Sequence, residues 1–254
     1  MTPFARVSIW SSRTWPCASS SFRAAGRSAS TVKRVSLELG GKSPQLVFPD
    51  APDWAAVAAQ VAIAIFWNMG ENCSAGSRLI VHRSVKGRLL EALEAELAGW
   101  SVGDPLEPST RIGALINRER LETVLGYVRA GEAEGARVVL GGRQLFADSG
   151  GYFVGPTVLD NVRNEMRVAR EEIFGPVLSV IEFETEAEAV AIANDTDYGL
   201  AASVYTNDLN VAHRVTRELR AGTVGVNCYA EGDMTTPFGG YRMSGFNGHD
   251  KSVH

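Results

Sequence analysis

The stretch Asn68-Met-Gly-Glu-Asn-Cys-Ser-Ala-Gly-Ser-Arg78 joins two segments of different character. Before it, residues 53–68 carry an apolar face and begin with Asp53, a helix-start signal. This pattern predicts a helix. After it, residues 78–82 form a short apolar run, which predicts a strand. Small and polar residues fill the stretch itself, so it is expected to be a loop, and the loop contains Cys73.

The same alternation of helices and strands continues along the chain. Thr185 with Glu188 forms a capping box for one predicted helix, and Ser84 is the predicted N-cap of another. Strands that alternate with helices predict an α/β fold. No internal repeat or low-complexity linker divides residues 35–254. The remaining predicted strands are 35–39, 45–48, 137–140, 176–183, 201–205 and 223–227, and the remaining predicted helices are 84–100, 117–134, 185–194 and 208–220.

Composition excludes several classes of protein. The 254 residues include 25 Lys and Arg and 29 Asp and Glu, a net charge of −4 that argues against a basic nucleic-acid binder. Apolar residues make up 45% of the chain, too many for a disordered protein. No stretch approaches the roughly 18 apolar residues of a membrane-spanning helix. Three cysteines form no even disulfide framework, which predicts a reducing compartment and a cytoplasmic location.

The first 34 residues differ from the rest in charge. Residues 35–254 contain 19 basic and 29 acidic residues, a charge of −10, whereas the first 34 contain no acidic residue. An Arg-rich, Ser-rich and acid-poor segment is typical of an organelle transit peptide. The other interpretation is a stretch without an evolved fold, such as an out-of-frame reading. The six basic residues are Arg6, Arg13, Arg23, Arg27, Lys33 and Arg34.

Cys73 is the first candidate for chemistry. A thiol in a polar loop can be exposed, and backbone N–H groups of the loop can stabilise its thiolate. The same donors could receive the oxyanion that forms when sulfur attacks a carbonyl. The alternative is that a lone cysteine is a small buried hydrophobe, which fits Cys228 better because Cys228 follows an apolar strand. The local sequence leaves this choice open for Cys73.

Acidic residues supply further candidates. Glu38 lies between two leucines near the end of a predicted strand, where partial desolvation would raise its pKa toward general-base use. The alternative is a solvent-facing position on an alternating strand. Glu171 and Glu172 precede the apolar strand 176–183, and there the alternative is a polar turn. The four histidines show no metal-ligand spacing, so no metal site is predicted.

Known nucleotide-binding loops are incomplete in this sequence. Gly40-Gly-Lys-Ser43 looks like the end of a phosphate loop, but Ser36 stands where the full pattern needs glycine, so a Walker loop is rejected. No G-x-G-x-x-G occurs either. The absence of that fingerprint does not exclude nucleotide binding.

Five segments, taken together, point to a family. In their order and spacing they resemble the aldehyde dehydrogenase superfamily, over about residues 30–254. The resemblance implies an NAD(P)-dependent oxidoreductase whose aldehyde dehydrogenase-like catalytic domain has a parallel-rich sheet flanked by helices. The segments are Leu37-Glu-Leu-Gly-Gly-Lys-Ser-Pro44, Gly70-Glu-Asn-Cys-Ser-Ala-Gly-Ser-Arg78, Glu172-Ile-Phe-Gly-Pro176, Pro237-Phe-Gly-Gly-Tyr241 and Ser244-Gly245.

The resemblance also implies roles for five residues. Cys73 matches the catalytic thiol, and Glu38 matches the general base that activates the deacylating water. Glu172 matches the acid that holds the nicotinamide ribose of NAD or NADP, Phe174 packs beside it, and Phe238 matches a substrate-binding position. In the family's reaction the thiolate adds to a small aldehyde and forms a thiohemiacetal. Hydride then passes to NAD(P)+, and water releases the carboxylic acid from the resulting thioester.

Departures from the family pattern suggest how the chain is divided. The family's chains are considerably longer, and most of the N-terminal Rossmann-like cofactor domain, with its oxyanion-hole asparagine, finds no match here. We expect residues 1–30 to be an unrelated or disordered leader, 31–40 a remnant strand of the cofactor domain, 41–242 the catalytic domain and 243–254 a truncated tail. Because a transit peptide joined inside a domain makes little structural sense, we favour a frameshift or a truncated gene.

Two functions follow from these expectations. The first is a truncated aldehyde dehydrogenase that is inactive alone, and the second is a non-catalytic remnant or an interaction module that pairs with intact relatives. The family is homo-oligomeric, but its pairing strand finds no match after Ser244-Gly245. Neither nucleic acid nor a membrane is an expected partner. Glu231 and Asp233 could attract an aminoaldehyde or lie in a solvated loop, and the choice between NAD and NADP is not encoded in these residues.

Overall fold

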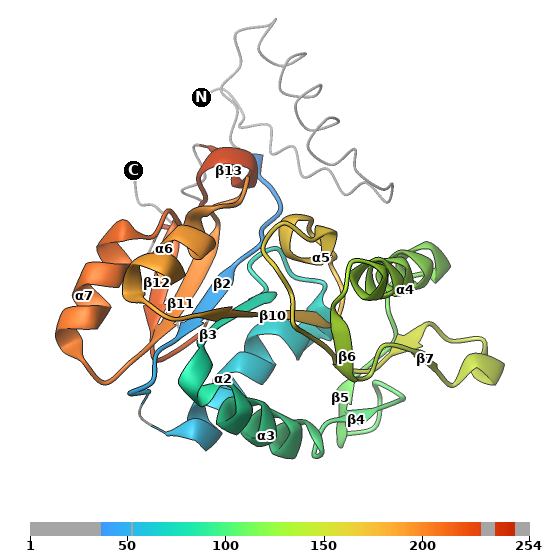
Figure 1. The fold of residues 1–254 in the computed structure, drawn as a ribbon. Coiled ribbons are helices and arrows are strands. Elements are labelled where there is room, and N and C mark those ends of the chain that lie inside the picture. The colour runs from blue at the N-terminus through green and yellow to red at the C-terminus, as the bar shows by residue number, and fades with distance from the viewer. Residues whose placement is uncertain (1–36, 52, 230–236, 247–254) are drawn as a thin grey trace, which may run out of the picture.

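A seven-stranded sheet forms the centre of the molecule (Figure 1). The computed structural model describes residues 37–51, 53–229 and 237–246. The strand order is β12-β11-β2-β3-β10-β9-β6, and all neighbours are parallel except β6, which runs antiparallel to β9. The expected α/β fold with a parallel-rich sheet is therefore confirmed. The seven strands are β2 (Pro44–Val47), β3 (Arg78–His82), β6 (Arg137–Leu140), β9 (Thr157–Asp160), β10 (Val177–Phe183), β11 (Ala201–Tyr205) and β12 (Thr223–Val226).

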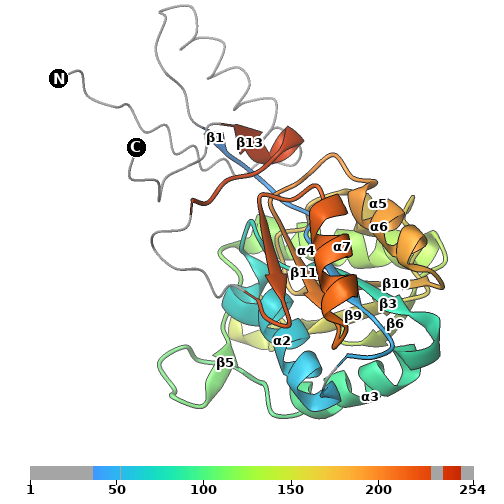
Figure 2. The ribbon, with the colours of Figure 1, turned by 90° about the vertical axis from the view of Figure 1, so that its left-hand side faces the viewer.

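Helices cover both faces of this sheet (Figures 1 and 2). Helices α2 and α3 share one core with Val47, Leu79 and Val81, whereas α6 and α7 share the opposite core with Leu46 and Ile80. Helices α4 and α5 form a third cluster beside that second core. Successive strand residues face opposite sides, so the central strands are apolar on both faces, as parallel sheets require. The helices are α2 (Trp54–Phe66), α3 (Lys86–Leu97), α4 (Arg118–Ala133), α5 (Arg167–Arg170), α6 (Glu186–Asn194) and α7 (Leu209–Glu218).

Short paired strands and single turns complete the described part of the chain. Three two-stranded ladders, β1-β13, β4-β5 and β7-β8, lie outside the central sheet. None of the helices in the described ranges combines the length and apolar character needed to cross a bilayer. The ladders are formed by β1 (Leu37–Glu38), β4 (Ser101–Val102), β5 (Thr110–Ile112), β7 (Gln144–Leu145), β8 (Phe153–Val154) and β13 (Gly245–Phe246).

Side-chain caps start most of the helices. Asp53, Asn117, Thr185 and Asp208 each accept a backbone N–H bond at the N-cap position. The predicted cap at Ser84 is wrong. A 3₁₀ turn over Arg83–Val85 precedes α3, and the His82 ring accepts the N–H of Ser84, so the first turn is organised by the strand that precedes it.

The strand expected over 35–39 is described only at β1, and it lies outside the central sheet. Leu37 and Glu38 pair antiparallel with β13. The Ser244 hydroxyl donates to the Gly40 carbonyl over 2.7 Å and accepts the N–H of Gly199 over 3.0 Å. Residues 243–246, expected to be part of a truncated tail, therefore hold the segment that carries Glu38.

A buried arginine fixes the centre of the fold. Arg78, the first residue of β3, has no exposed surface. Its guanidinium donates to the carbonyls of Lys42, Ile192 and Ala193 and to Oδ1 of Asn164, over 2.8–3.1 Å. Four acceptors compensate for the loss of water around a charged group. The contacts join the start of β3 to the segment before β2 and to the end of α6.

Left-handed backbone follows α2 and starts the loop that carries Cys73. Asn68, Met69 and Gly70 have φ values of 51°, 57° and 69°. The Asn68 side chain supports this turn by donating to the Glu71 carbonyl over 2.9 Å. A Cβ atom on Gly70 would lie 2.3 Å from the Gly175 carbonyl oxygen. Gly70 thus combines a left-handed φ with close backbone contact to the segment before β10.

We expect Gly70→Ala to lower the free energy of unfolding by about 2–5 kcal/mol, because a left-handed alanine is strained and its methyl group overlaps backbone atoms. Gly87→Ala is the matched control, since a Cβ on Gly87 meets no atom within 4 Å and the residue lies in α3. That control should be neutral or stabilising by up to about 1 kcal/mol. Urea unfolding of both variants tests this difference, and similar stabilities would contradict it.

Candidate active site

Three of the residues singled out in the sequence lie just before adjacent strands. Glu38 precedes β2, Cys73 precedes β3 and Glu172 precedes β10. Strands β2, β3 and β10 are consecutive in the sheet and parallel, so their amino ends meet at one edge. Ligands of open α/β sheets usually bind at the opposite, carboxyl edge. The order of segments in the chain therefore brings these three acid and thiol groups to one side of the sheet.

Two glycines allow the three segments to meet closely. The N–H of Gly41 donates to Oε1 of Glu172 over 3.0 Å. A Cβ on Gly41 would lie 2.3 Å from the Cys73 carbonyl oxygen, and a Cβ on Gly40 would lie 2.3 Å from Oε2 of Glu172. Gly40 and Gly41 therefore pack by their backbone between the cysteine loop and the Glu172 carboxylate, where no side chain fits.

The Cys73 thiol is held in its neutral form. Burial raises its pKa above the ordinary value, and the carboxylates of Glu172 and Glu38 act in the same direction. The backbone N–H of Ser74 opposes them and lowers the pKa. The sequence suggested a thiol in an open loop with a stabilised thiolate. Cys73 is instead half-buried, and desolvation outweighs the backbone donor.

Glu38 is exposed, so the desolvation that its leucine neighbours suggested is not found. Leu37 is buried, and the alternation of β1 turns the next residue outward. Of the two interpretations of Glu38, the solvent-facing position is therefore the one that the structure shows. Glu38 still lies near enough to Cys73 to raise the pKa of the thiol.

Burial raises the pKa of Glu172 to about 7, although the Gly41 N–H, Lys42 and Arg120 all favour its charged form. Phe174, two residues later, has φ 56°, a strained value for a non-glycine residue. The Arg120 guanidinium lies 5.6 Å from the centre of the Phe174 ring and donates to the Ile173 carbonyl over 3.2 Å. Arg120, which drew no attention in the sequence, therefore supports the turn that presents Glu172 and Phe174.

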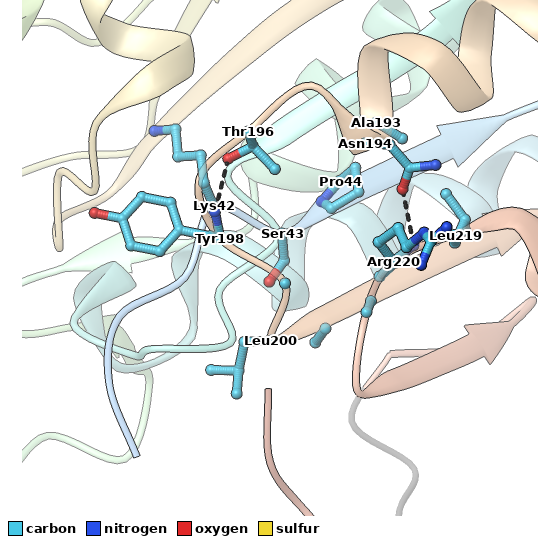
Figure 3. A pocket seen from close by; sticks show the side chains of 14 residues that line it. Lys42, Ser43, Pro44, Ala193, Asn194, Thr196, Tyr198, Leu200, Leu219 and Arg220 are labelled. Atoms are coloured by element: carbon cyan, nitrogen blue, oxygen red, sulfur yellow. Dashed lines mark hydrogen bonds between the residues drawn. The ribbon is translucent and has the colours of Figure 1, made fainter. Parts of the chain in front are cut away.

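Lys42 is a second buried group of this region that sequence reasoning missed. It is 1% exposed, and within the described residues its Nζ has no hydrogen-bond partner. Burial and the neighbouring Arg78 lower its pKa to about 7, against the opposing effect of Glu172. In Figure 3 the side chain points away from Asn194 and Arg220, toward the side on which the Tyr198 ring lies. Cys73 and Glu172 do not line the small pocket drawn there.

The remaining predicted residues are less informative. Phe238 is half-buried, and its substrate-binding role stays a prediction. Glu231 and Asp233 lie outside the described residues. In the described ranges, no group of three or more His, Cys, Asp and Glu residues could hold a metal ion. Tyr229, which the sequence did not single out, bonds to Asn72 and to Ser74, the two neighbours of Cys73.

Comparison with known proteins shows the family of the chain. The sequence model of the Aldehyde dehydrogenase family matches residues 21–254. The chain belongs to the aldehyde dehydrogenase family. It is 54% identical over 224 residues to an aminoacetaldehyde dehydrogenase of Pseudomonas aeruginosa, and this match covers 88% of the chain and 44% of the relative. It is 45% identical over 225 residues to the NADP/NAD-dependent aldehyde dehydrogenase PuuC of Escherichia coli K12, covering 89% of the chain and 44% of the relative.

Solved structures of other aldehyde dehydrogenases share the fold. An indole-3-acetaldehyde dehydrogenase in complex with NAD+ matches with a TM-score of 0.90 and 52% identity, over 93% of this chain and 48% of that one. The aldehyde dehydrogenase KauB of Pseudomonas aeruginosa matches with a TM-score of 0.89 and 54% identity, over 93% and 47%. The chain thus spans about half the length of the curated relatives and solved structures that it matches.

Two buried ionisable groups of this region, Lys42 and Glu172, predict opposite pH effects on stability. The pKa of Lys42 is about 7 in the folded chain, below its ordinary 10.5, so between these values the unfolded chain binds the extra proton. Stability from Lys42 therefore rises with pH above 7. The pKa of Glu172 is about 7, above its ordinary 4.5, so stability from Glu172 falls as pH rises from 4.5 to 7.

We expect Lys42→Met to raise the free energy of unfolding by about 1–3 kcal/mol at pH 7, because it removes an unpartnered buried donor. It should also abolish the rise in stability between pH 7 and 9, a range below the pKa of about 9 of Arg78, and leave the fall between pH 4.5 and 7 that comes from Glu172. Lys86→Met is the control, since Lys86 pairs with Asp160 and Glu182 and its loss should destabilise. Melting temperatures measured across pH test this. A destabilised Lys42→Met variant at pH 7 would contradict it.

Proposed function

We propose that these residues form the aldehyde-oxidising site of the family, which converts an aldehyde, NAD(P)+ and water to a carboxylic acid and NAD(P)H. Cys73 is the nucleophile, and Glu38 activates the water that releases the acid. The observation that carries the proposal is the meeting of Cys73, Glu38 and Glu172 around Gly40 and Gly41 at one edge of the sheet. A half-buried thiol beside two carboxylates has no packing purpose that a small apolar residue would not serve better.

The roles of the two carboxylates follow from their surroundings. Cys73 adds to the aldehyde carbon as a thiolate, so its proton must leave before the carbon–sulfur bond forms. The acid product leaves when water attacks the thioester carbon and the sulfur departs. Glu38 is exposed to solvent and close enough to Cys73 to affect the pKa of the thiol. This position supports a role in which Glu38 takes a proton from a water molecule rather than from the thiol.

The described residues fit one end of a nicotinamide cofactor. Glu172 would hold the nicotinamide ribose, because Gly41 fixes one of its oxygens and carboxylates suit ribose hydroxyl groups. Phe174 would pack beside that ribose, and the Arg120 contact holds its ring in place. NAD(P)+ supplies a hydride acceptor when bound. The NAD+ complex of the related indole-3-acetaldehyde dehydrogenase supports this cofactor class.

The substrate proposal rests on relatives and on two acidic residues. An aminoacetaldehyde dehydrogenase is 54% identical to this chain over 224 residues. Glu231 and Asp233 would supply the negative charge that an aminoaldehyde ammonium group prefers. We therefore propose a small aldehyde of the aminoaldehyde class. The cytoplasmic location expected from the cysteines stays part of this proposal.

We expect no NAD(P)+-dependent aldehyde oxidation by the purified 254-residue chain. The resemblance assigns the adenosine and pyrophosphate contacts to the part of the relatives that this chain does not match. A nicotinamide misplaced by about 1 Å can cost roughly a hundredfold in rate. A missing oxyanion-hole donor costs about 10²–10³ more. Weak hydrolysis of an activated ester should remain, because it needs only the nucleophile, a base and part of the oxyanion hole.

Both activities are measured on the same preparation. NADH formation is followed by absorbance with an aminoaldehyde, and hydrolysis of p-nitrophenyl acetate is followed by phenolate release. Cys73→Ala should abolish the hydrolysis, whereas Cys228→Ala is the control and should leave it unchanged. Robust NADH production that Cys73→Ala removes would show the inactivity proposal wrong. Hydrolysis that survives in Cys73→Ala would show the nucleophile proposal wrong.

A further inference from the structure

Three side chains beside the Cys73 thiol form a closed ring of hydrogen bonds. Asn72 Nδ2 lies 3.0 Å from the Tyr229 hydroxyl oxygen, which lies 3.2 Å from Ser74 Oγ. Ser74 Oγ lies 3.3 Å from Asn72 Oδ1 and closes the ring. The backbone N–H of Tyr229 donates to Oε1 of Gln60 on α2 over 2.9 Å. Tyr229 is therefore anchored to a helix and reaches both neighbours of Cys73.

The direction of each hydrogen bond in the ring follows from the donors. The backbone N–H of Ser74 must donate, and the Asn72 side-chain atom that faces it at 3.3 Å is therefore the oxygen. The Asn72 amide group then faces Tyr229, which accepts from it. Ser74 Oγ donates to the Asn72 oxygen, so its only proton is used, and the Tyr229 hydroxyl donates to Ser74 Oγ. Each hydroxyl both donates and accepts, the arrangement in which neighbouring hydrogen bonds strengthen one another.

This ring acts on the thiol through the Asn72 oxygen. Cys73 Sγ lies 3.8 Å from that oxygen, which accepts from a thiol but repels a thiolate. The same oxygen shares the Ser74 N–H, the backbone donor that lowers the pKa of Cys73. Glu172, Glu38 and the Tyr229 hydroxyl are the titratable groups that face the sulfur. The carboxylates favour the thiol as well, so the ring works with them.

We propose that Tyr229 is a positioning residue that fixes the Asn72 carboxamide with its oxygen toward the sulfur and so holds the resting nucleophile as a thiol. The inference rests on the proposed role of Cys73 as the nucleophile. When the ring opens, the carboxamide is released. The Ser74 N–H is then no longer shared with the Asn72 oxygen and can donate to the sulfur alone. The Asn72 amide group can also rotate toward the sulfur and act as a donor. Both changes favour the thiolate, so opening the ring activates the nucleophile.

The test is the pH profile of Cys73 alkylation in Tyr229→Phe. The chain is treated with iodoacetamide, an uncharged reagent, and the labelling rates of Cys73 and Cys228 are read from their separate peptides by mass spectrometry. We expect the midpoint of the Cys73 profile to fall by about one pH unit, the order of one hydrogen bond gained by the charged form. Below both midpoints the rate should rise roughly tenfold. The midpoint for Cys228 should stay where it is.

Two further variants complete the test. Tyr152→Phe is the matched control, because Tyr152 contacts Arg118 and lies outside the ring, and its Cys73 midpoint should equal that of the unaltered chain. Asn72→Ala removes the oxygen itself and should lower the midpoint too, so it decides the question if Tyr229→Phe does not fold by circular dichroism. An unchanged or higher midpoint in the folded variant overturns the inference. Ester hydrolysis that survives in Cys73→Ala would instead count against the nucleophile proposal, whatever the alkylation profiles show.

Discussion

The buried guanidinium of Arg78 joins the segments from which the site is built. The residue ends the cysteine loop, and its side chain binds the carbonyl of Lys42, which follows the Glu38 and Gly-Gly segment. Its other bonds reach the end of α6 and Asn164. Burial lowers the pKa of Arg78 to about 9, so it stays charged at neutral pH. A charged group without water must keep its acceptors in place, and these acceptors fix the relative positions of two site segments.

Glycine completes what Arg78 begins. The Arg78 contacts bring the cysteine loop and the Glu38 segment together, but a Cβ at Gly40 or Gly41 would overlap Glu172 or Cys73. The site is therefore built at the amino edge of β2, β3 and β10 from backbone contact, with the reactive side chains arranged around it. This close packing explains why the thiol is half-buried, and why burial raises the pKa of the neighbouring Glu172 to about 7. Two further residues act on the thiol. Tyr229, in the segment after β12, is bonded to Gln60 of α2, and Asn72 is bonded to Tyr229.

Local signals predicted the elements that local forces determine. The helix starts at Asp53 and Thr185 were readable because each is a side chain bonded to its own first turn. Strand β9 was missed because only Val158 and Leu159 of its four residues are apolar, a run too short to indicate a strand. The exposure of Glu38 follows from pairing with β13, more than 200 positions away, and the ring at Tyr229 joins residues 157 positions apart. Contacts between distant segments leave no pattern in one sequence, so these features required the structure.

The central claim is that the edge of β2, β3 and β10 makes Cys73 a covalent nucleophile. It is tested most directly by acid-quenching the 254-residue chain during p-nitrophenyl acetate hydrolysis and mapping the acetyl group by mass spectrometry. The account predicts one acetyl group on the Cys73 peptide, present as a thioester that neutral hydroxylamine removes. Acetylation confined to lysines or to Cys228, with an unmodified Cys73 peptide, would contradict it.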